Sequence, residues 1–279
     1  EREGAYEYSS NYYKDSENWS YDYEYSNENS WDYSYGSATA VQDSIIKLGK
    51  GSDKLTINAT SDGINRAIAL ENSIVKGGDG SDKIYLYGDI YDSKIYLGSG
   101  NDLIRIEGGG RSRVKGGSGK DRLYGGNGVD KFYGGKGKDR LYGGKGEDRL
   151  YGEKGEDRLY GEKGKDRLYG GKGEDKLYGG KGNDKLYGGD GNDWLFGGVG
   201  NDKLYGGDGE DIFRVKKGYG RTLIKDFEDG EDKIFIGTGI SKTKLTTRNG
   251  DALIHQGNDL LAIIKNAAGD LTQDGSYFV

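Results

Sequence analysis

The feature that most constrains this chain is an uninterrupted array of eleven nonapeptides running from Gly116 to Arg214. The array begins GGSGKDRLY, GGNGVDKFY, GGKGKDRLY, and in every copy the sixth residue is Asp and the eighth is Leu or Phe. A short fixed period is typical of solenoid folds, in which each repeat buries its apolar side chain only against its neighbours. The array therefore predicts a stack of coils and excludes an ordinary globular core.

Each position of the repeat has a physical role. Glycines at positions one, two and four permit the left-handed backbone of a tight turn. Positions seven to nine are too few for a helix but suffice for a short strand, with the eighth side chain pointing inward. We expect two nonapeptides to make one coil, so that repeats 18 residues apart stack as parallel strands about 4.8 Å from each other.

This stacking places the aspartates of successive coils in a column of like charge. Such a column repels itself, and the glycine-rich turns lose much conformational entropy on ordering. Calcium takes roughly six to eight oxygen ligands from carboxylates and backbone carbonyls, whereas magnesium demands a stricter octahedron. The pattern therefore indicates multiple Ca²⁺ ions in the turns; a glycine-rich solenoid that needs no metal is the alternative, and it leaves the invariant Asp without a purpose.

The consensus GGxGxDxUx, where U is large and apolar, resembles the RTX or haemolysin-type calcium-binding repeat of secreted bacterial proteins. The resemblance implies an all-β fold, a right-handed parallel β-roll or β-solenoid with calcium in the GGxGxD turns. It also implies that each turn is half a site, closed by the turn two repeats along. Glu153 and Glu162 replace the second glycine, which leaves the geometry of their two turns open. The carboxylate ligands carried over are Asp121, Asp130, Asp139, Asp148, Asp157, Asp166, Asp175, Asp184, Asp193, Asp202 and Asp211.

The flanks of the array divide the chain into further segments. Residues 37–115 hold looser copies of the pattern, with aspartates at Asp53, Asp82 and Asp102, and we interpret them as irregular coils with partial metal sites that include Asp82 and Asp102. Residues 215–279 resemble the segment that caps RTX rolls, and an open solenoid end needs such a cap. Its last residues are interpreted equally well as a signal for type I secretion or as the final cap strand.

Residues 1–36 form an arm of different composition, with nine acidic and two basic residues among aromatic, Ser and Asn residues. Segments such as Tyr21-Asp22-Tyr23-Glu24-Tyr25 alternate as a strand does, with one aromatic and one acidic face. We expect the arm to pair with another copy of the chain; a disordered linker or folding onto its own roll are the alternatives. The expected assembly residues are Tyr6, Tyr8, Tyr12, Trp19, Tyr21, Tyr23, Tyr25, Trp31 and Tyr33.

The sequence lacks the residues that several classes of function require. The chain has no cysteine and a single histidine, His255, which lies in an alternating segment of the cap and is expected to be structural. No GxSxG motif is present, and no apolar run approaches the roughly 18 residues of a transmembrane helix. The arm is acidic and the basic residues of the array are interleaved with Asp, which disfavours nucleic-acid binding. We therefore do not expect an enzyme.

The residues favour a secreted structural protein that folds on binding calcium and self-assembles at the cell surface into an extracellular fibre, sheath or surface layer. The expected partner is a second copy of the chain. The alternatives are a carrier or secretion module of a secreted enzyme, toxin or adhesin, and a surface protein that binds cell-surface polysaccharide through tyrosine columns such as Tyr124, Tyr142 and Tyr160.

Overall fold

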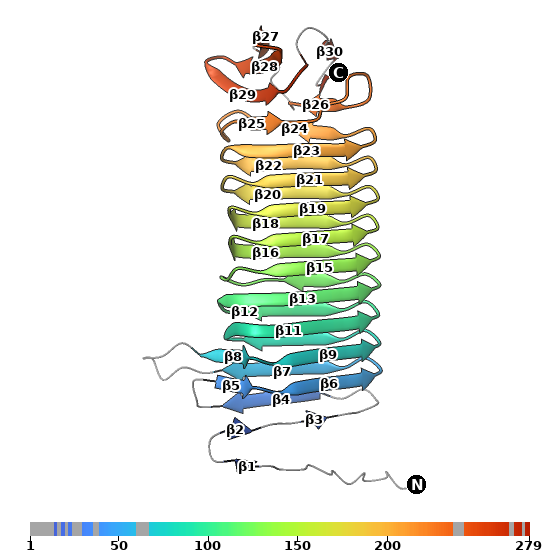
Figure 1. Cartoon of the computed structure of the whole chain (residues 1–279), viewed down its shortest axis with the longest axis vertical. Coiled ribbons are helices and arrows are strands. Elements are labelled where there is room, and N and C mark those ends of the chain that lie inside the picture. Colours follow the sequence, from blue (N-terminus) through green and yellow to red (C-terminus); the bar gives the residue numbers. More distant parts are fainter. Residues whose placement is uncertain are drawn as a thin grey trace.

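The coils of the chain stack into one long solenoid, with the N-terminal coils at the bottom and the C-terminal strands at the top of Figure 1. The computed structural model describes residues 14–15, 18–19, 22–23, 30–35, 39–59, 67–236, 243–267, 271–274 and 277–279, and side chains from residue 40 onward. Within these ranges the chain forms strands and turns without any helix, and so contains no helix able to cross a membrane. The all-β fold and the parallel solenoid expected from the repeat are confirmed.

Two sheets form the long walls of the solenoid, and the chain alternates between them. From the N-terminal end, the first sheet is β4 (Ser30–Tyr35), β7 (Lys54–Ala59), β10 (Lys83–Tyr87), β12 (Leu103–Glu107), β14 (Arg122–Tyr124), β16 (Arg140–Gly146), β18 (Arg158–Gly164), β20 (Lys176–Lys181), β22 (Trp194–Val199), β24 (Ile212–Arg214), β26 (Lys233–Phe235), β31 (Tyr277–Phe278) and β30 (Gln273–Asp274). The second sheet is β3 (Asp22–Tyr23), β6 (Ile45–Lys50), β9 (Ile74–Asp79), β11 (Asp89–Ser99), β13 (Gly110–Ser118), β15 (Lys131–Lys136), β17 (Arg149–Lys154), β19 (Arg167–Lys172), β21 (Lys185–Asp190), β23 (Asp202–Asp208), β25 (Thr222–Ile224), β29 (Asp259–Ile264), β28 (Asp251–Gln256) and β27 (Thr243–Arg248), with β5 (Thr39–Gln42) and β8 (Ile68–Glu71) beside it.

Within the array, equivalent residues of successive coils pair in parallel, 18 residues apart. Leu141 of β16 lies between Leu123 of β14 and Leu159 of β18 in the ladder. Most strands are longer than positions seven to nine, because the first three residues of the next repeat continue the pairing, as in Lys131–Lys136. The strand is therefore longer than the three residues expected, because the two glycines after Tyr133 belong to it.

The core is a column of single apolar side chains along each sheet. The eighth residue of every repeat, for example Leu159 or Phe132, is fully buried. Upstream of the array the core is richer, since strands such as β10 bury two large side chains, Ile84 and Leu86. The array thus has much less apolar surface to bury per coil than the segment before it.

The C-terminal end is closed by antiparallel strands. β27, β28 and β29 form a meander joined to β25, and β31 pairs antiparallel with β26 and β30. His255 lies in β28 of this cap, as expected from its alternating segment. Tyr277 and Phe278 near the C-terminus therefore form a cap strand, one of the two interpretations of that segment.

The N-terminal end begins with residues of the acidic arm. β3 pairs parallel with β6, and β4 pairs parallel with β7 over its six residues, while β1 (Lys14–Asp15) and β2 (Asn18–Trp19) pair with each other. These parts of the arm extend the chain's own roll, which is the folding-back alternative. Of the expected assembly residues, Trp19, Tyr23, Trp31 and Tyr33 lie in these short strands, and Tyr6, Tyr8, Tyr12, Tyr21 and Tyr25 lie outside the described residues.

Candidate metal centre

The invariant aspartates form two ladders, one along each edge where the chain turns from one sheet to the other. On the first edge, the backbone N–H of Asp139 donates to Oδ1 of Asp157 at 2.7 Å. On the second edge, the N–H of Asp148 donates to Oδ1 of Asp166 at 2.9 Å. Each aspartate thus connects its turn to the turn one coil away, 18 residues along the chain. The resulting ladder is the column of like charge that the repeat predicts.

The second carboxylate oxygen of each aspartate is buried and has no hydrogen-bond partner. A buried polar atom in this state costs on the order of 1–3 kcal/mol, and more if it is charged. Repetition of the same orphan atom along the whole array indicates a missing ligand and not a local packing defect. The residues whose Oδ2 is in this state are Asp82, Asp102, Asp121, Asp130, Asp139, Asp148, Asp157, Asp166, Asp175, Asp184, Asp193, Asp202 and Asp211.

The first glycine of each repeat leaves the space into which this oxygen points. A Cβ placed on Gly152 would lie 2.5 Å from Oδ2 of Asp157 and 2.5 Å from the carbonyl oxygen of Gly170. The same pair of oxygens meets at Gly161, from Asp166 and Gly179. Carboxylate and carbonyl oxygens therefore converge over a glycine in repeat after repeat, and this is the mixed donor set that calcium takes.

Without a cation the buried carboxylates titrate abnormally. Desolvation, with a smaller contribution from the neighbouring aspartates in the ladder, raises the pKa of Asp148 and Asp193 to about 8. Burial likewise raises the pKa of Asp157 to about 7, against the lowering effect of the hydrogen bond from the Asp139 N–H. The ionised ladder is thus unfavourable by itself, and a divalent cation would remove the penalty.

The residues fit calcium, with backbone oxygens as the remaining ligands. In the described part of the chain, no group of three or more Asp, Glu or His side chains converges on a common point. Each site therefore has few carboxylates, and the Gly carbonyl beside Oδ2 in most repeats supplies oxygen of the kind that completes a calcium shell. When calcium is bound it neutralises the ladder, while the chain's own role is to hold the oxygens in register.

The two departures from the consensus keep the backbone of the turn. Glu153 and Glu162 adopt φ values of 77° and 72°, in the left-handed region that the glycines at this position also occupy, as at Gly171 with 116°. The ladder also continues through these turns, since the Asp157 N–H donates to Oδ1 of Asp175 at 2.7 Å. The backbone at these two positions and the hydrogen bonds of the ladder are therefore preserved.

On the second edge, a serine ladder replaces aspartate in the coils before the array. The backbone N–H of Ser73 donates to Oγ of Ser93 at 3.0 Å, and the Ser93 hydroxyl donates to the Tyr91 carbonyl at 2.8 Å. Ser44 and Ser73 repeat this arrangement, and Ser112 joins it to the aspartate ladder by donating to Oδ1 of Asp130. These neutral turns satisfy their own hydrogen bonds, so the upstream coils present metal-type aspartates on the first edge only.

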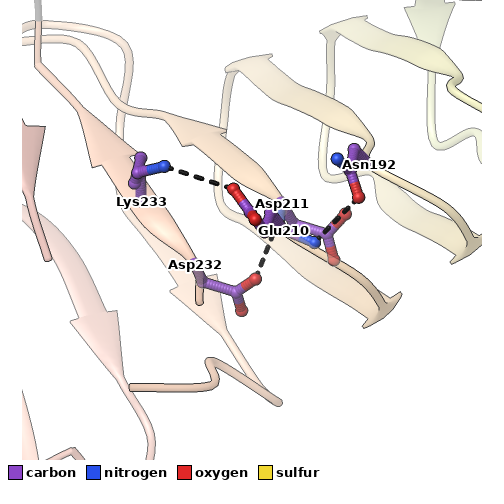
Figure 2. Close-up of polar contacts among 5 residues, drawn as sticks. All are labelled: Asn192, Glu210, Asp211, Asp232 and Lys233. Atoms are coloured by element: carbon purple, nitrogen blue, oxygen red, sulfur yellow. Dashed lines mark hydrogen bonds and ion pairs between the residues drawn. The ribbon is translucent and has the colours of Figure 1, made fainter. Parts of the chain in front are cut away.

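At the C-terminal end the first-edge ladder closes on Asp232 (Figure 2). The N–H of Asp211 donates to Oδ1 of Asp232 at 2.9 Å. The N–H of Glu228 donates to Oδ2 of Asp232 at 2.9 Å. Beside it, the Glu210 N–H donates to Oδ1 of Asn192 at 3.0 Å, and Lys233 pairs with Glu210. Because both oxygens of Asp232 have protein donors, the ladder ends there without an orphan atom.

All of the sequence-predicted metal residues lie in these ladders. Asp82, Asp102 and the odd-numbered repeats, beginning with Asp121, lie on the first edge, and the even-numbered repeats, beginning with Asp130, lie on the second. The serine ladder and the role of Asp232 were missed. A signal for the serines was present in the spacing, because Ser112 precedes Asp130 by the 18 residues of one coil.

The comparison with family models agrees with this geometry. The family model of the RTX calcium-binding nonapeptide repeat, which spans four copies, matches residues 107–141, 133–168, 142–177, 151–186, 160–195 and 187–219. A comparison with curated proteins finds no match. Among solved structures, the chain is similar to the extracellular lipase LipA from Serratia marcescens, with 20% identity, a TM-score of 0.30, and coverage of 68% of this chain and 43% of the lipase chain.

The chain thus spans less than half of the length of that lipase. The match of the repeat model to residues 107–219 coincides with the two aspartate ladders and their orphan oxygens. Residues 107–219 are therefore an array of RTX calcium-binding nonapeptide repeats.

Proposed function

We propose that this protein is a secreted, calcium-folded structural rod that assembles outside the cell through its N-terminal end and has no catalytic role. The observation that supports assembly is the edge of β4. This strand pairs with β7 on one side, and no described strand pairs with its other side. An unpaired parallel edge is a template for strand addition by a second copy, and a head-to-tail contact that does not close produces a filament.

The dependence of folding on calcium supports the same proposal, because the free edge of β4 forms only when the roll has folded. The array has little apolar core, and its buried carboxylates oppose folding without a cation, so metal binding is coupled to folding. RTX repeats belong to proteins that are typically secreted, and calcium outside the cell would fold the roll there. A cell-surface location as a fibre, sheath or layer follows from assembly at this edge and from export by type I secretion.

Light scattering during a calcium titration tests the proposal on three chains. The full chain and a chain beginning at Ser30 both keep β4, whereas a chain beginning at Ser37 lacks it. We expect the first two to polymerise with calcium and the third to assemble less or not at all. If all three stay monomeric while calcium folds them, the assembly proposal is wrong, and the chain is better described as the carrier module of a secreted effector.

A further inference from the structure

The outer face of the second sheet carries a trough that runs along the solenoid. Along each of β15, β17 and β19, the outward-facing residues are a Lys or Arg, a Tyr and then the residue at position two of the next repeat, and a Lys follows at the end of the strand. Because equivalent residues of successive coils pair with one another, each of these residue types forms a column along the solenoid. The glycines leave a floor between the tyrosine column and the corner lysines. Lys115, Gly117, Tyr133, Gly135, Lys136 and Lys154 line this trough, together with Glu153 and Lys172, and its volume is about 540 Å³.

The tyrosines present ring edges and not ring faces to a ligand. Tyr133, Tyr151 and Tyr169 stack on one another with centroids 4.8 Å apart and interplanar angles of 11° and 3°. The ammonium of Lys115 lies 5.6 Å from the centroid of Tyr133, at the N-terminal end of the stack. Because the ring faces are covered in this way, the trough is unsuited to stacking on a neutral sugar ring.

The charge of this face is strongly one-sided. Along the trough from Lys115 to Lys172 the only acidic side chain among the columns is Glu153. The cations of these columns are Lys115, Lys131, Lys136, Arg149, Lys154, Arg167 and Lys172. Beyond them, Asp190 follows in the corner column and pairs with Lys172 at 2.6 Å, so the basic stretch has a defined end.

The first sheet provides an internal comparison. Its corresponding trough has a volume of about 380 Å³ and is lined by Lys145 and Lys163, but also by Glu107 and Glu162. Two acidic side chains therefore offset its lysines. The two troughs therefore differ in local charge, with four lysines and one acidic side chain on the second sheet against two lysines and two acidic side chains on the first. Farther along the first sheet, Lys176 and Lys181 continue its own cation columns.

The trough cannot bind a peptide by strand addition. Each of β15, β17 and β19 already has a parallel partner on both sides, so their backbone groups are occupied by neighbouring coils. Recognition must therefore use side chains, which offer cations and phenol edges at the 4.8 Å spacing of the coils. We propose that this trough binds a linear acidic polysaccharide, in which carboxylates and hydroxyls recur along the chain, and that it does so in the calcium-loaded state. This proposal is independent of whether rods assemble at β4.

Fluorescence anisotropy tests the proposal with a labelled oligogalacturonate short enough not to gel with calcium. The calcium-loaded full chain is compared with K136N/K154N/K172N, in which Asn is the residue already present at the same position in Asn127. The matched control is K145N/K163N/K181N on the first sheet, with the same loss of charge. We expect about tenfold weaker binding for the first variant and much less change for the control, because Glu107 and Glu162 already offset the charge of Lys145 and Lys163 in their trough.

Three outcomes would overturn the proposal: equal losses in both variants, equal binding of a neutral dextran, or displacement of the oligogalacturonate by a peptide of residues 1–36 at much lower concentration. The last result would assign the trough to the arm of another copy. Calcium-induced circular dichroism checks that both variants fold. If the first variant does not fold, the test is lysine acetylation of the unaltered chain with and without oligogalacturonate. The proposal then requires that the bound oligogalacturonate protect Lys136 and Lys154 from acetylation more than Lys145 and Lys163.

Discussion

Oδ1 of Asp157 accepts a 2.7 Å hydrogen bond from the backbone N–H of Asp139 in the preceding coil, while Oδ2 of Asp157 is buried without a hydrogen-bond partner. One oxygen of the carboxylate thus maintains the stacking of the coils, and the other is available to a cation. Repeated along both edges, this division makes the same side chain part of the fold and part of the metal site.

Asp157→Asn separates these two roles. The amide oxygen can still accept the hydrogen bond from the Asp139 N–H, but the variant lacks the charge that attracts calcium. We expect the calcium concentration at half-folding to rise by about tenfold, which corresponds to about 1.4 kcal/mol. A calcium titration followed by circular dichroism measures it. Glu156→Gln is the control, because Glu156 is an exposed neighbour paired with Lys138, and an equal effect there would contradict a specific role for Asp157.

The metal-free chain should become less stable as the pH rises. Burial raises the pKa of Asp157 to about 7 and of Asp148 to about 8, so the folded state binds more protons than the unfolded state. The carboxyl contribution to stability is then complete below the ordinary pKa of 3.8 and is lost as the pH passes through these raised values.

Circular dichroism in chelator should therefore show more β-structure at about pH 6 than at about pH 8.5. With saturating calcium the order should reverse, because protons compete with calcium for the same oxygens. A metal-free chain that is better folded at the higher pH would show that the ladder is not the dominant titrating element.

Much of this arrangement could be predicted from the sequence, because a strict nine-residue period places the same residue types at the same positions of every coil. The Asp at position six and the Leu or Phe at position eight, as in Asp157 and Leu159, predicted the ladder and the core column. The upstream coils follow no strict period, since their aspartates are 20 and 19 residues apart from Asp82 to Asp121. Of the serines on the second edge, Ser112 therefore has the 18-residue spacing of the array, to Asp130, whereas Ser73 and Ser93 are separated by turns of unequal length.

The N-terminal arm shows a different limit. Its alternation of aromatic and acidic residues predicted strands, and β4 is one. Alternation specifies which residues share a face of a strand but says nothing about the strand's partner. The pairing of β4 with β7 depends on the first coil presenting an open edge, which only the assembled solenoid reveals.

Glu153→Gly should stabilise the roll. Glu153 adopts a φ of 77°, a conformation that costs a residue with a Cβ on the order of 1–2 kcal/mol and costs glycine little. We expect about 1 kcal/mol greater unfolding free energy in calcium, measured by denaturant titration. Glu174→Gly is the matched control, because Glu174 is an exposed acid of the array without a left-handed φ, and glycine there should destabilise. Equal effects at both positions would rule out relief of backbone strain.

The serine ladder predicts that calcium removal unfolds the chain unevenly. The coils of residues 67–115 bury two large apolar side chains in strands such as β10, and on their second edge a ladder of Ser73, Ser93 and Ser112 takes the place of the aspartate ladder. The array buries one such side chain per strand and has aspartates on both edges. Hydrogen exchange of the full chain in chelator should therefore leave residues 67–115 partly protected while residues 125–205 exchange freely.

Ser93→Ala, which leaves the Ser73 N–H without its acceptor, should remove that protection, and the exposed Ser99→Ala should not. Simultaneous loss of protection in both segments of the unaltered chain would mean that calcium controls the whole solenoid as one unit.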